Sequence, residues 1–210
     1  MLYEILSVIA LGIGLSFIGS LPFGIINMTV AETTVRKGLR AGLWVGLGAA
    51  MVEFLQAWLS LKLIDIFVQH ARWEKAFNFI ALFVFFVLAL VYFRAARRAP
   101  IHREARVGSF PKVPDYFRGV LVSSLNVMVF PYWIFYGAYL STNGWMNLGN
   151  LDITFFAAGA MLGAFSIFLI YAGLGMLLIK RASTLTKYFN WFLVVLFLGL
   201  GVYQAWKVFS

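Results

Sequence analysis

The apolar run from Leu2 to Ala31 is too long for one ordinary membrane helix, and this length limits how the chain can fold. Glu4 is the one charged residue in these 30 residues. A helix of that length would extend about 45 Å, whereas the hydrocarbon core of a bilayer is about 30 Å thick. Pro22 lies within the run, where it removes a backbone hydrogen bond and clashes with the preceding turn. We therefore expect a helix that breaks near Pro22 to Gly24 and then resumes.

Such a break has two interpretations. Non-helical backbone at membrane depth persists only where protein or a water-filled cavity satisfies its polar groups. In transporters, interrupted helices of this kind line the substrate site. The other interpretation is a simple proline kink in a continuous helix. This stretch is compatible with both.

The composition indicates a polytopic membrane protein of the all-α class. Hydrophobic residues make up 62% of the chain and charged residues 12%, and the mean hydropathy is +0.89. Several nearly uncharged segments exceed the length that a membrane helix needs. The net charge of +9 arises from basic residues in loops beside these segments, so it indicates membrane orientation rather than nucleic-acid binding. The chain has no cysteine, which excludes disulfides and thiolate metal sites.

Six membrane spans are expected in one transmembrane domain that covers residues 1–210. Their approximate ranges are 3–33, 41–64, 77–95, 116–140, 153–179 and 188–206. We expect the first and fourth spans to be broken or kinked, because they contain Pro22 and Pro131 respectively. The longest polar loop, about 95–116, separates two halves of three spans each.

Basic residues predict the orientation. The loops after the first, third and fifth spans hold thirteen Lys and Arg residues, and the opposite side holds four. By the positive-inside rule, the loop at 95–116 is cytoplasmic and both termini lie outside, in a bacterial inner membrane. The halves, about 1–95 and 116–210, then enter the membrane from opposite faces, which is the arrangement of an inverted repeat.

A short internal match agrees with this arrangement. Residues 20–22, Ser-Leu-Pro, align with residues 124–126, Ser-Leu-Asn, at an offset of 104 residues. The same offset places Asn27 on Pro131. Each half would then carry one proline and one asparagine at equivalent depth, in swapped order.

Glu53 is the leading candidate for a functional side chain. It lies in the middle of the second span, with Gln56 at i+3 and Ser60 at i+7 on the same helical face. A carboxylate in hydrocarbon costs several kcal/mol, so it should face the protein interior and either pair or bind a proton. Proton coupling is the functional interpretation, and a hydrogen bond across helices is the structural one.

Small residues recur at every fourth position in the first two spans. Such stripes allow two helix backbones to approach closely. We expect the two stripes to pack the first and second spans together and to bring Glu53 near the Pro22 break. The stripes consist of Gly12, Ser16, Ser20 and Gly24, and of Gly38, Gly42, Gly46 and Ala50.

Other polar residues are secondary candidates. Asn27 and Asn126 could cap a broken helix end or bind a substrate carboxylate or ammonium group. Glu32 and Arg36, spaced i,i+4, are expected to pair at the membrane interface. The two histidines are isolated in loops, and the chain lacks phosphate-binding and nucleophile motifs. We therefore expect no metal site, no cofactor and no enzymatic activity.

At three places the chain resembles the LysE-type translocator family of amino-acid exporters. Pro22-Phe23-Gly24-Ile25-Ile26-Asn27 stands where the family has a Pro-Gly-Pro motif. The glycine pattern from Gly38 to Gly48 leads to Glu53, where the family commonly has aspartate. Asn126 with Pro131-Tyr132-Trp133 resembles the family's Asn-Pro-xxx-Pro-aromatic-Trp region. Phe23-Gly24-Ile25 replaces Gly-Pro, and Val127 replaces the proline after the asparagine.

The resemblance implies a secondary exporter of amino acids or similar small zwitterions, driven by proton exchange through alternating access. Its partners would be a small-molecule substrate, protons and the lipid bilayer, with no nucleic acid; a homo-oligomer is compatible with the sequence. The alternatives are an exporter of ions or other metabolites with the same fold, and a non-transporting scaffold or assembly factor. The candidate substrate-binding residues are Pro22, Gly24, Asn27, Asn126 and Pro131, with Glu53 for proton coupling and Gln56, Glu32 and Arg36 as accessory residues.

Overall fold

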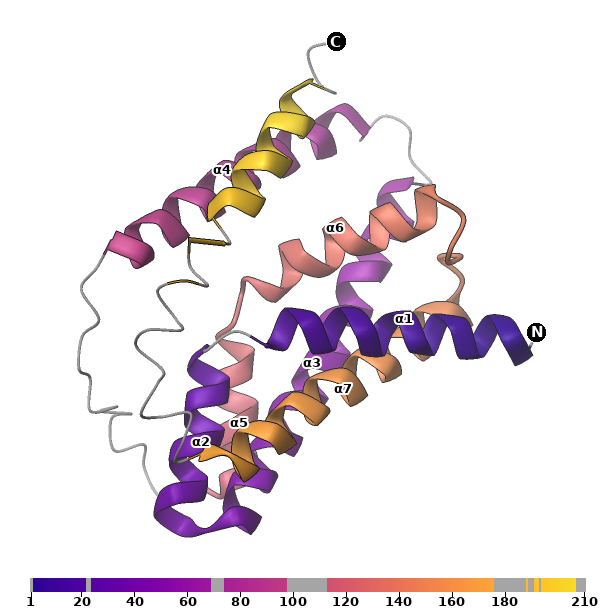
Figure 1. Ribbon diagram of the computed structural model, residues 1–210. Coiled ribbons are helices and arrows are strands. Elements are labelled where there is room, and N and C mark those ends of the chain that lie inside the picture. The colour runs from indigo at the N-terminus through magenta and orange to yellow at the C-terminus, as the bar shows by residue number, and fades with distance from the viewer. Residues whose placement is uncertain are drawn as a thin grey trace. The chain divides into compact units, whose positions relative to one another are not determined.

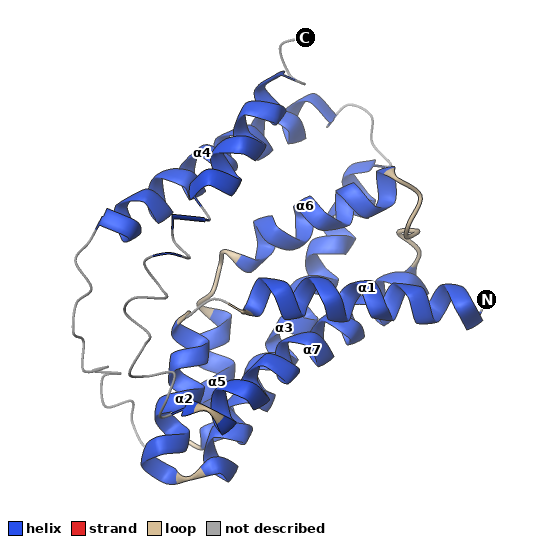
Figure 2. Ribbon diagram, in the orientation of Figure 1, coloured by secondary structure: helices blue, strands red, loops and turns tan. Residues whose placement is uncertain are grey.

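The computed structural model is mostly helical in the residues that it describes, which contain short loops between the helices and no strand (Figures 1 and 2). These residues are 2–21, 24–68, 74–97, 113–175, 188, 191–192 and 194–206. The chain divides into two compact units. Met1–Ile64 and Glu104–Arg181 form the first unit, and Asp65–Arg103 and Ala182–Ser210 form the second.

The first unit contains most of the helices. They are α1 (Leu2–Ser20), α2 (Ile25–Lys37), α3 (Leu39–Val68, whose last residues belong to the second unit), α5 (Asp115–Ser124), α6 (Val129–Thr142) and α7 (Asn150–Gly173). Its apolar core lies in two clusters that both include α7. One joins Val30, Val45 and Ile167, and the other joins Ala57, Trp133 and Phe156, among others.

The second unit contains α4 (Glu74–Arg97) and a helical segment at Val194–Trp206. Aromatic side chains join these two segments. The ring of Tyr92 stacks on that of Phe197, with centroids 5.6 Å apart, and Phe85 also lies against Phe197. The α4 helix covers the range expected for the third span, and the segment Val194–Trp206 lies within the range expected for the sixth.

Three described helical segments are long and apolar enough to cross a membrane: Tyr3–Ser20, Leu39–Ile64 and Asn150–Gly173. The pair α5 and α6 adds a fourth if it is counted as one span, and it is bent by 68°. The apolar helical segments in the second unit, Phe85–Arg94 and Val194–Trp206, are shorter. The six spans and the inverted repeat therefore remain predictions. Residues 98–112, most of the expected cytoplasmic loop, lie outside the described residues.

Both expected helix breaks coincide with helix ends in the structure. We call residues 21–24, between α1 and α2, the first interruption, and residues 125–128, between α5 and α6, the second interruption. Pro22 and Phe23 lie outside the described residues. α2 has 13 residues and contains Glu32, Arg36 and Lys37, so it is too short and polar to span a bilayer alone.

Glycines allow α1 and α7 to cross at backbone contact. A Cβ atom at Gly12 would clash with the carbonyl oxygen of Phe156, and one at Gly159 would clash with the carbonyl oxygen of Ile9. Each glycine therefore accommodates the main chain of the opposite helix. We call this the α1–α7 crossing.

The helices α3 and α5 cross in the same reciprocal manner. A Cβ atom at Gly119 would clash with the carbonyl oxygen of Val45, and one at Gly48 would clash with that of Tyr116. We call this the α3–α5 crossing. Gly12 and Gly119 have matching contacts and lie 107 residues apart, whereas the match of short sequences suggested an offset of 104.

The two small-residue stripes do not face each other, so the expected partner of the first stripe was wrong, although the second stripe packs at Gly42 against α2, the resumed part of the expected first span. Gly12 faces α7, as described above. In the second stripe, the space beside Gly42 is filled by Thr34 of α2, and that beside Gly46 by Phe168 of α7. A stripe of small residues indicates that some backbone or side chain approaches closely, but it does not specify which helix.

Candidate functional site

Glu53 lies in the middle of α3, as expected, and its side chain is buried with 7% of the residue exposed. The indole Nε1–H of Trp133 donates a hydrogen bond to Glu53 Oε1 at 3.2 Å. Trp133 belongs to α6 and is completely buried. Its ring has edge-to-face contacts with Phe156 of α7 and with Tyr132, at centroid distances of 5.4 and 4.9 Å. The carboxylate is therefore held by a donor whose own position is fixed by packing.

Gln56 lies one turn after Glu53 and contacts the second interruption. Its Nε2 donates to the backbone carbonyl oxygens of Ser123 and Asn126 at 3.3 and 3.4 Å. These carbonyls lie where α5 ends, and in place of the i+4 bond of a continuous helix each accepts a nearer backbone N–H, that of Asn126 for Ser123 and that of Val129 for Asn126. Gln56 therefore caps the end of α5. Its Oε1 is buried without a hydrogen-bond partner.

The two candidates Asn126 and Pro131 occupy different parts of the second interruption. Asn126 lies inside it and is partly buried. Pro131 is the third residue of α6, in the first turn, where a missing N–H leaves no helical hydrogen bond unmade. The chain therefore leaves the helical conformation before the proline, and Pro131 permits the new helix rather than breaking one.

Two side chains donate hydrogen bonds to backbone carbonyl groups at the start of the first interruption. Asn27 is buried, and its Nδ2 donates to the carbonyl oxygen of Ser20 at 2.7 Å. The hydroxyl of Tyr171, on α7, donates to the carbonyl oxygen of Leu21 at 2.9 Å. Gly24 is exposed and is the N-cap residue of α2. Asn27 thus caps the end of α1 as Gln56 caps the end of α5.

Tyr132 connects α6 to α1. Its hydroxyl donates to the carbonyl oxygen of Leu15 at 2.7 Å, and its ring fills the space beside Gly19. Neither Tyr132 nor Tyr171 was predicted from the sequence to be a site residue. The available signal was a hydroxyl inside an apolar span, because such a group needs a hydrogen-bond partner when it is buried.

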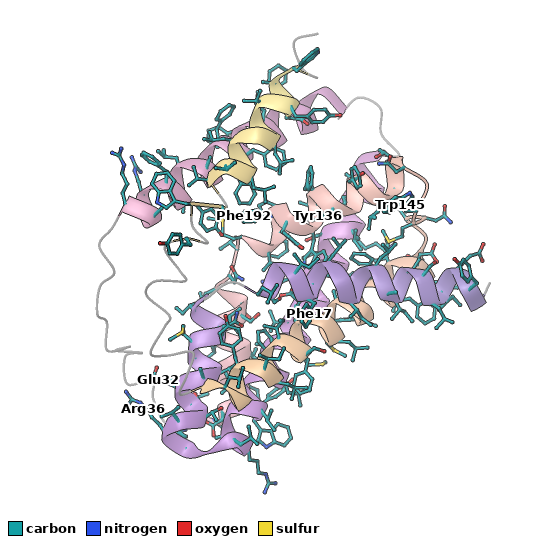
Figure 3. All side chains as sticks on the ribbon, in the orientation of Figure 1. Phe17, Glu32, Arg36, Tyr136, Trp145 and Phe192 are labelled. Atoms are coloured by element: carbon teal, nitrogen blue, oxygen red, sulfur yellow. The ribbon has the colours of Figure 1, made fainter. Side chains whose placement is uncertain are left out.

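Glu32 and Arg36 form the expected i,i+4 ion pair, with Arg36 Nη2 2.8 Å from Glu32 Oε1. Figure 3 shows both residues on α2, near the end distant from the first interruption. Next to this pair, Lys37 Nζ lies 2.6 Å from Asp115 Oδ1 and connects α2 to α5. The hydrogen bonds that connect Glu53 and Gln56 to the second interruption do not include Glu32 or Arg36.

Within the described residues, no group of three or more His, Cys, Asp or Glu side chains could hold a metal ion. The two histidines, His70 and His102, lie outside the described residues. The chemistry available at the site is therefore that of one carboxylate, amide groups, aromatic donors and the carbonyl groups at two helix ends.

The fold and these contacts define a class: an α-helical membrane protein with two interrupted helices and a buried carboxylate held against one of them. The chain belongs to the LysE type translocator family, whose family model matches residues 17–207. The match covers most of the chain and includes both interruptions and Glu53, so the resemblance drawn from the sequence motifs is confirmed. The family consists of transporters of small molecules rather than enzymes. Comparisons with curated proteins and with solved structures gave no match.

Proposed function

We propose that this chain is a secondary active exporter of amino acids or similar small zwitterions, coupled to protons through Glu53. The observation that carries the proposal is a buried carboxylate, in the middle of a membrane-spanning helix, that contacts an interrupted helix through Trp133. Intramembrane acids are costly, and they commonly serve as proton relays in transporters.

The surroundings of Glu53 support proton binding over a structural ion pair. The described salt bridges join Glu32 to Arg36 and Lys37 to Asp115, and neither includes Glu53. Its hydrogen-bond donor, the indole of Trp133, is neutral. An ionised Glu53 would therefore lack a counter-charge among the described residues, so either a proton or the ammonium group of a substrate would compensate it.

The two interruptions support a zwitterionic substrate. The α2 helix begins at the first interruption, and its N-terminal N–H groups carry partial positive charge. The α5 helix ends at the second interruption, and its carbonyl groups carry partial negative charge. Each interruption also holds the opposite kind of helix end, the carbonyl groups of α1 at the first and the N–H groups of α6 at the second, so each offers partial charges of both signs to a zwitterion. The proposed substrate-binding residues remain Pro22, Gly24, Asn27, Asn126 and Pro131, with Gln56, Glu32 and Arg36 as accessory residues.

The matched glycine contacts support an inverted-repeat arrangement. The α1–α7 crossing and the α3–α5 crossing have the same reciprocal pattern of glycine against carbonyl. In a protein of six spans, these would be the contacts of span one with span five and of span four with span two. A two-fold operation that exchanges the halves relates these two contacts to each other, and such repeats are the usual basis of alternating access.

Orientation in a bacterial inner membrane, with both termini outside, can be tested with single cysteines because the chain has none. A cysteine placed within residues 98–112 should resist an impermeant reagent in intact cells. A cysteine at the C-terminus should react. The opposite result at either position would contradict the proposed topology.

The experiment that tests the function is Glu53→Gln, with Glu53→Asp as its matched control. Gln keeps the shape of the side chain and still accepts from Trp133, but it cannot ionise. Uphill efflux should be lost, while exchange without a proton gradient persists, and Asp should retain part of the efflux. The substrate to assay comes from comparing the metabolites in the media of overexpressing and deletion cells.

Each other outcome supports a different conclusion. Full proton-driven efflux by Glu53→Gln would show that Glu53 is not the coupling group. Loss of the protein from the membrane would assign Glu53 a structural role, as in a scaffold or assembly factor. Accumulation of an ion or of a metabolite that is not a zwitterion would favour the exporter of other substrates with the same fold.

A further inference from the structure

The α3 helix holds both sides of the second interruption with two side chains that lie one turn apart. Gln56 binds the α5 side through the carbonyl oxygens of Ser123 and Asn126. Glu53 binds the α6 side through Trp133, the fifth residue of that helix. Residues at i and i+3 share one helical face, so both contacts come from the same surface of α3.

We propose that Trp133 is the positioning residue through which Glu53 controls the bend between α5 and α6, so that proton binding to Glu53 loosens α6 from α3. This inference rests on the proposed function, in which Glu53 carries the coupling proton. It adds a mechanical step. Proton binding weakens the hydrogen bond from Trp133 to Glu53, and α6, which follows the second interruption, then loosens from α3.

The two contacts differ in their response to a proton. An ionised acceptor makes a hydrogen bond roughly twice as strong as a neutral one, so the bond from Trp133 weakens when Glu53 becomes neutral. Trp133 has a single N–H and is completely buried, which leaves it no water as an alternative partner. The bonds from Gln56 join an amide to carbonyl groups and do not change. Protonation should therefore release α6 and leave α5 in place.

Among the described neighbours of Glu53, the hydrogen bond from Trp133 is the contact whose strength depends on the charge of Glu53. On α6, the ionisable side chains beside this hydrogen bond are Tyr132, whose ring contacts Trp133, and Tyr136, whose ring contacts Tyr132. From α7, Phe156 packs on Trp133, and from α1 the carbonyl of Leu15 meets Tyr132. None of these described neighbours is a basic group.

The test measures the distance between α3 and α6 in the full-length protein with two spin labels. Leu55 on α3 and Tyr139 on α6 are both exposed and can be replaced by cysteine, since the chain has no other. A second pair, Leu55 with the exposed Leu121 of α5, reports the side held by Gln56. Distance distributions are recorded in mildly alkaline and in mildly acidic buffer.

In the parent protein, acid should shift the α3–α6 distribution toward longer distances, changing the ratio of the two populations by about fivefold. The α3–α5 distribution should not change. Glu53→Gln and Trp133→Phe should each give the acid distribution in both buffers, the first because the charge is absent and the second because the N–H is absent. Trp206→Phe, the same change at an exposed position, should behave as the parent.

The inference is overturned if Trp133→Phe retains the response of the parent, or if the parent does not respond to acid. If Trp133→Phe does not give a folded protein, 3-benzothienylalanine at position 133 removes the N–H and keeps the ring shape. Efflux by Glu53→Gln separates the two proposals. Persistent proton-driven efflux with the expected distances refutes the coupling role alone, whereas lost efflux with an unchanged response of Trp133→Phe refutes the positioning role alone.

Discussion

The two interruptions expose carbonyl groups at the end of a helix, and each is capped by a side-chain amide. At the first interruption, Asn27 caps the carbonyl of Ser20 over one short hydrogen bond. At the second, Gln56 reaches two carbonyls from another helix over longer bonds. The difference is that, among the described residues, the second interruption is linked by hydrogen bonds to the buried Glu53, through Gln56 one turn away and through Trp133. The amide caps, which both interruptions have, satisfy backbone carbonyl groups. The second interruption is also linked to a carboxyl group that can bind a proton.

Each interruption follows a helix that is anchored by a glycine crossing, so the largest effects are expected there. Gly12→Ala and Gly119→Ala should each destabilise the protein by about 2 kcal/mol or more, because the added methyl group meets backbone that cannot rotate away. Thermal unfolding in detergent measures the loss. Gly14 is the control, since no atom lies within 4 Å of a Cβ there. A much smaller loss of stability for one of the two variants would show that the two crossings are not equivalent.

Removing the capping amides tests whether the two caps have equal strength. Asn27→Leu should cost about 1–3 kcal/mol, because a part-buried carbonyl loses a short hydrogen bond. Gln56→Leu should cost less, because its bonds are longer and its unpartnered Oε1 is removed as well. Asn147→Ala, at an exposed position, serves as the control for unfolding measurements. A larger cost at Gln56 would reverse this ranking.

The tyrosine hydroxyls make a smaller contribution. Tyr171→Phe removes the donor to Leu21 at the first interruption, and Tyr132→Phe removes the donor from α6 to Leu15. Each should cost about 1 kcal/mol in the free energy of unfolding. If Tyr132 also positions α6 for transport, its variant alone should lower the rate of substrate efflux. Equal effects on efflux would remove this distinction between the interruptions.

The smallest effect is expected for the ion pair of Lys37 and Asp115, which connects α2 to α5 away from both interruptions. The Lys37 side chain is 51% exposed, so the coupling energy should be about 0.5 kcal/mol and should decrease with salt. A double-mutant cycle with Lys37→Met and Asp115→Asn measures it. A coupling several times larger would place this pair among the contacts that control the conformation.

Sequence reasoning predicted those features that depend on length and periodicity. The excessive apolar run and Pro22 predicted an interruption where α1 ends, and the i,i+3 spacing placed Glu53 and Gln56 on one face of α3. Periodicity identifies a face of a helix but not the helix that covers it. For that reason the sequence predicted the wrong partner for the Gly12 stripe. It also did not anticipate the hydrogen bond from Trp133, which depends on the packing of α6.

The glycine crossings have a consequence for how the protein could move. The α1–α7 crossing and the α3–α5 crossing each join a helix from the first half of the sequence to one from the second. Their main chains are in contact, so separating the halves would break both crossings at once. A motion that preserves the crossings would instead move α1 with α7 as one body and α3 with α5 as another. Each rigid body of the protein would then contain one helix from each half of the chain, so the two halves would be interlocked.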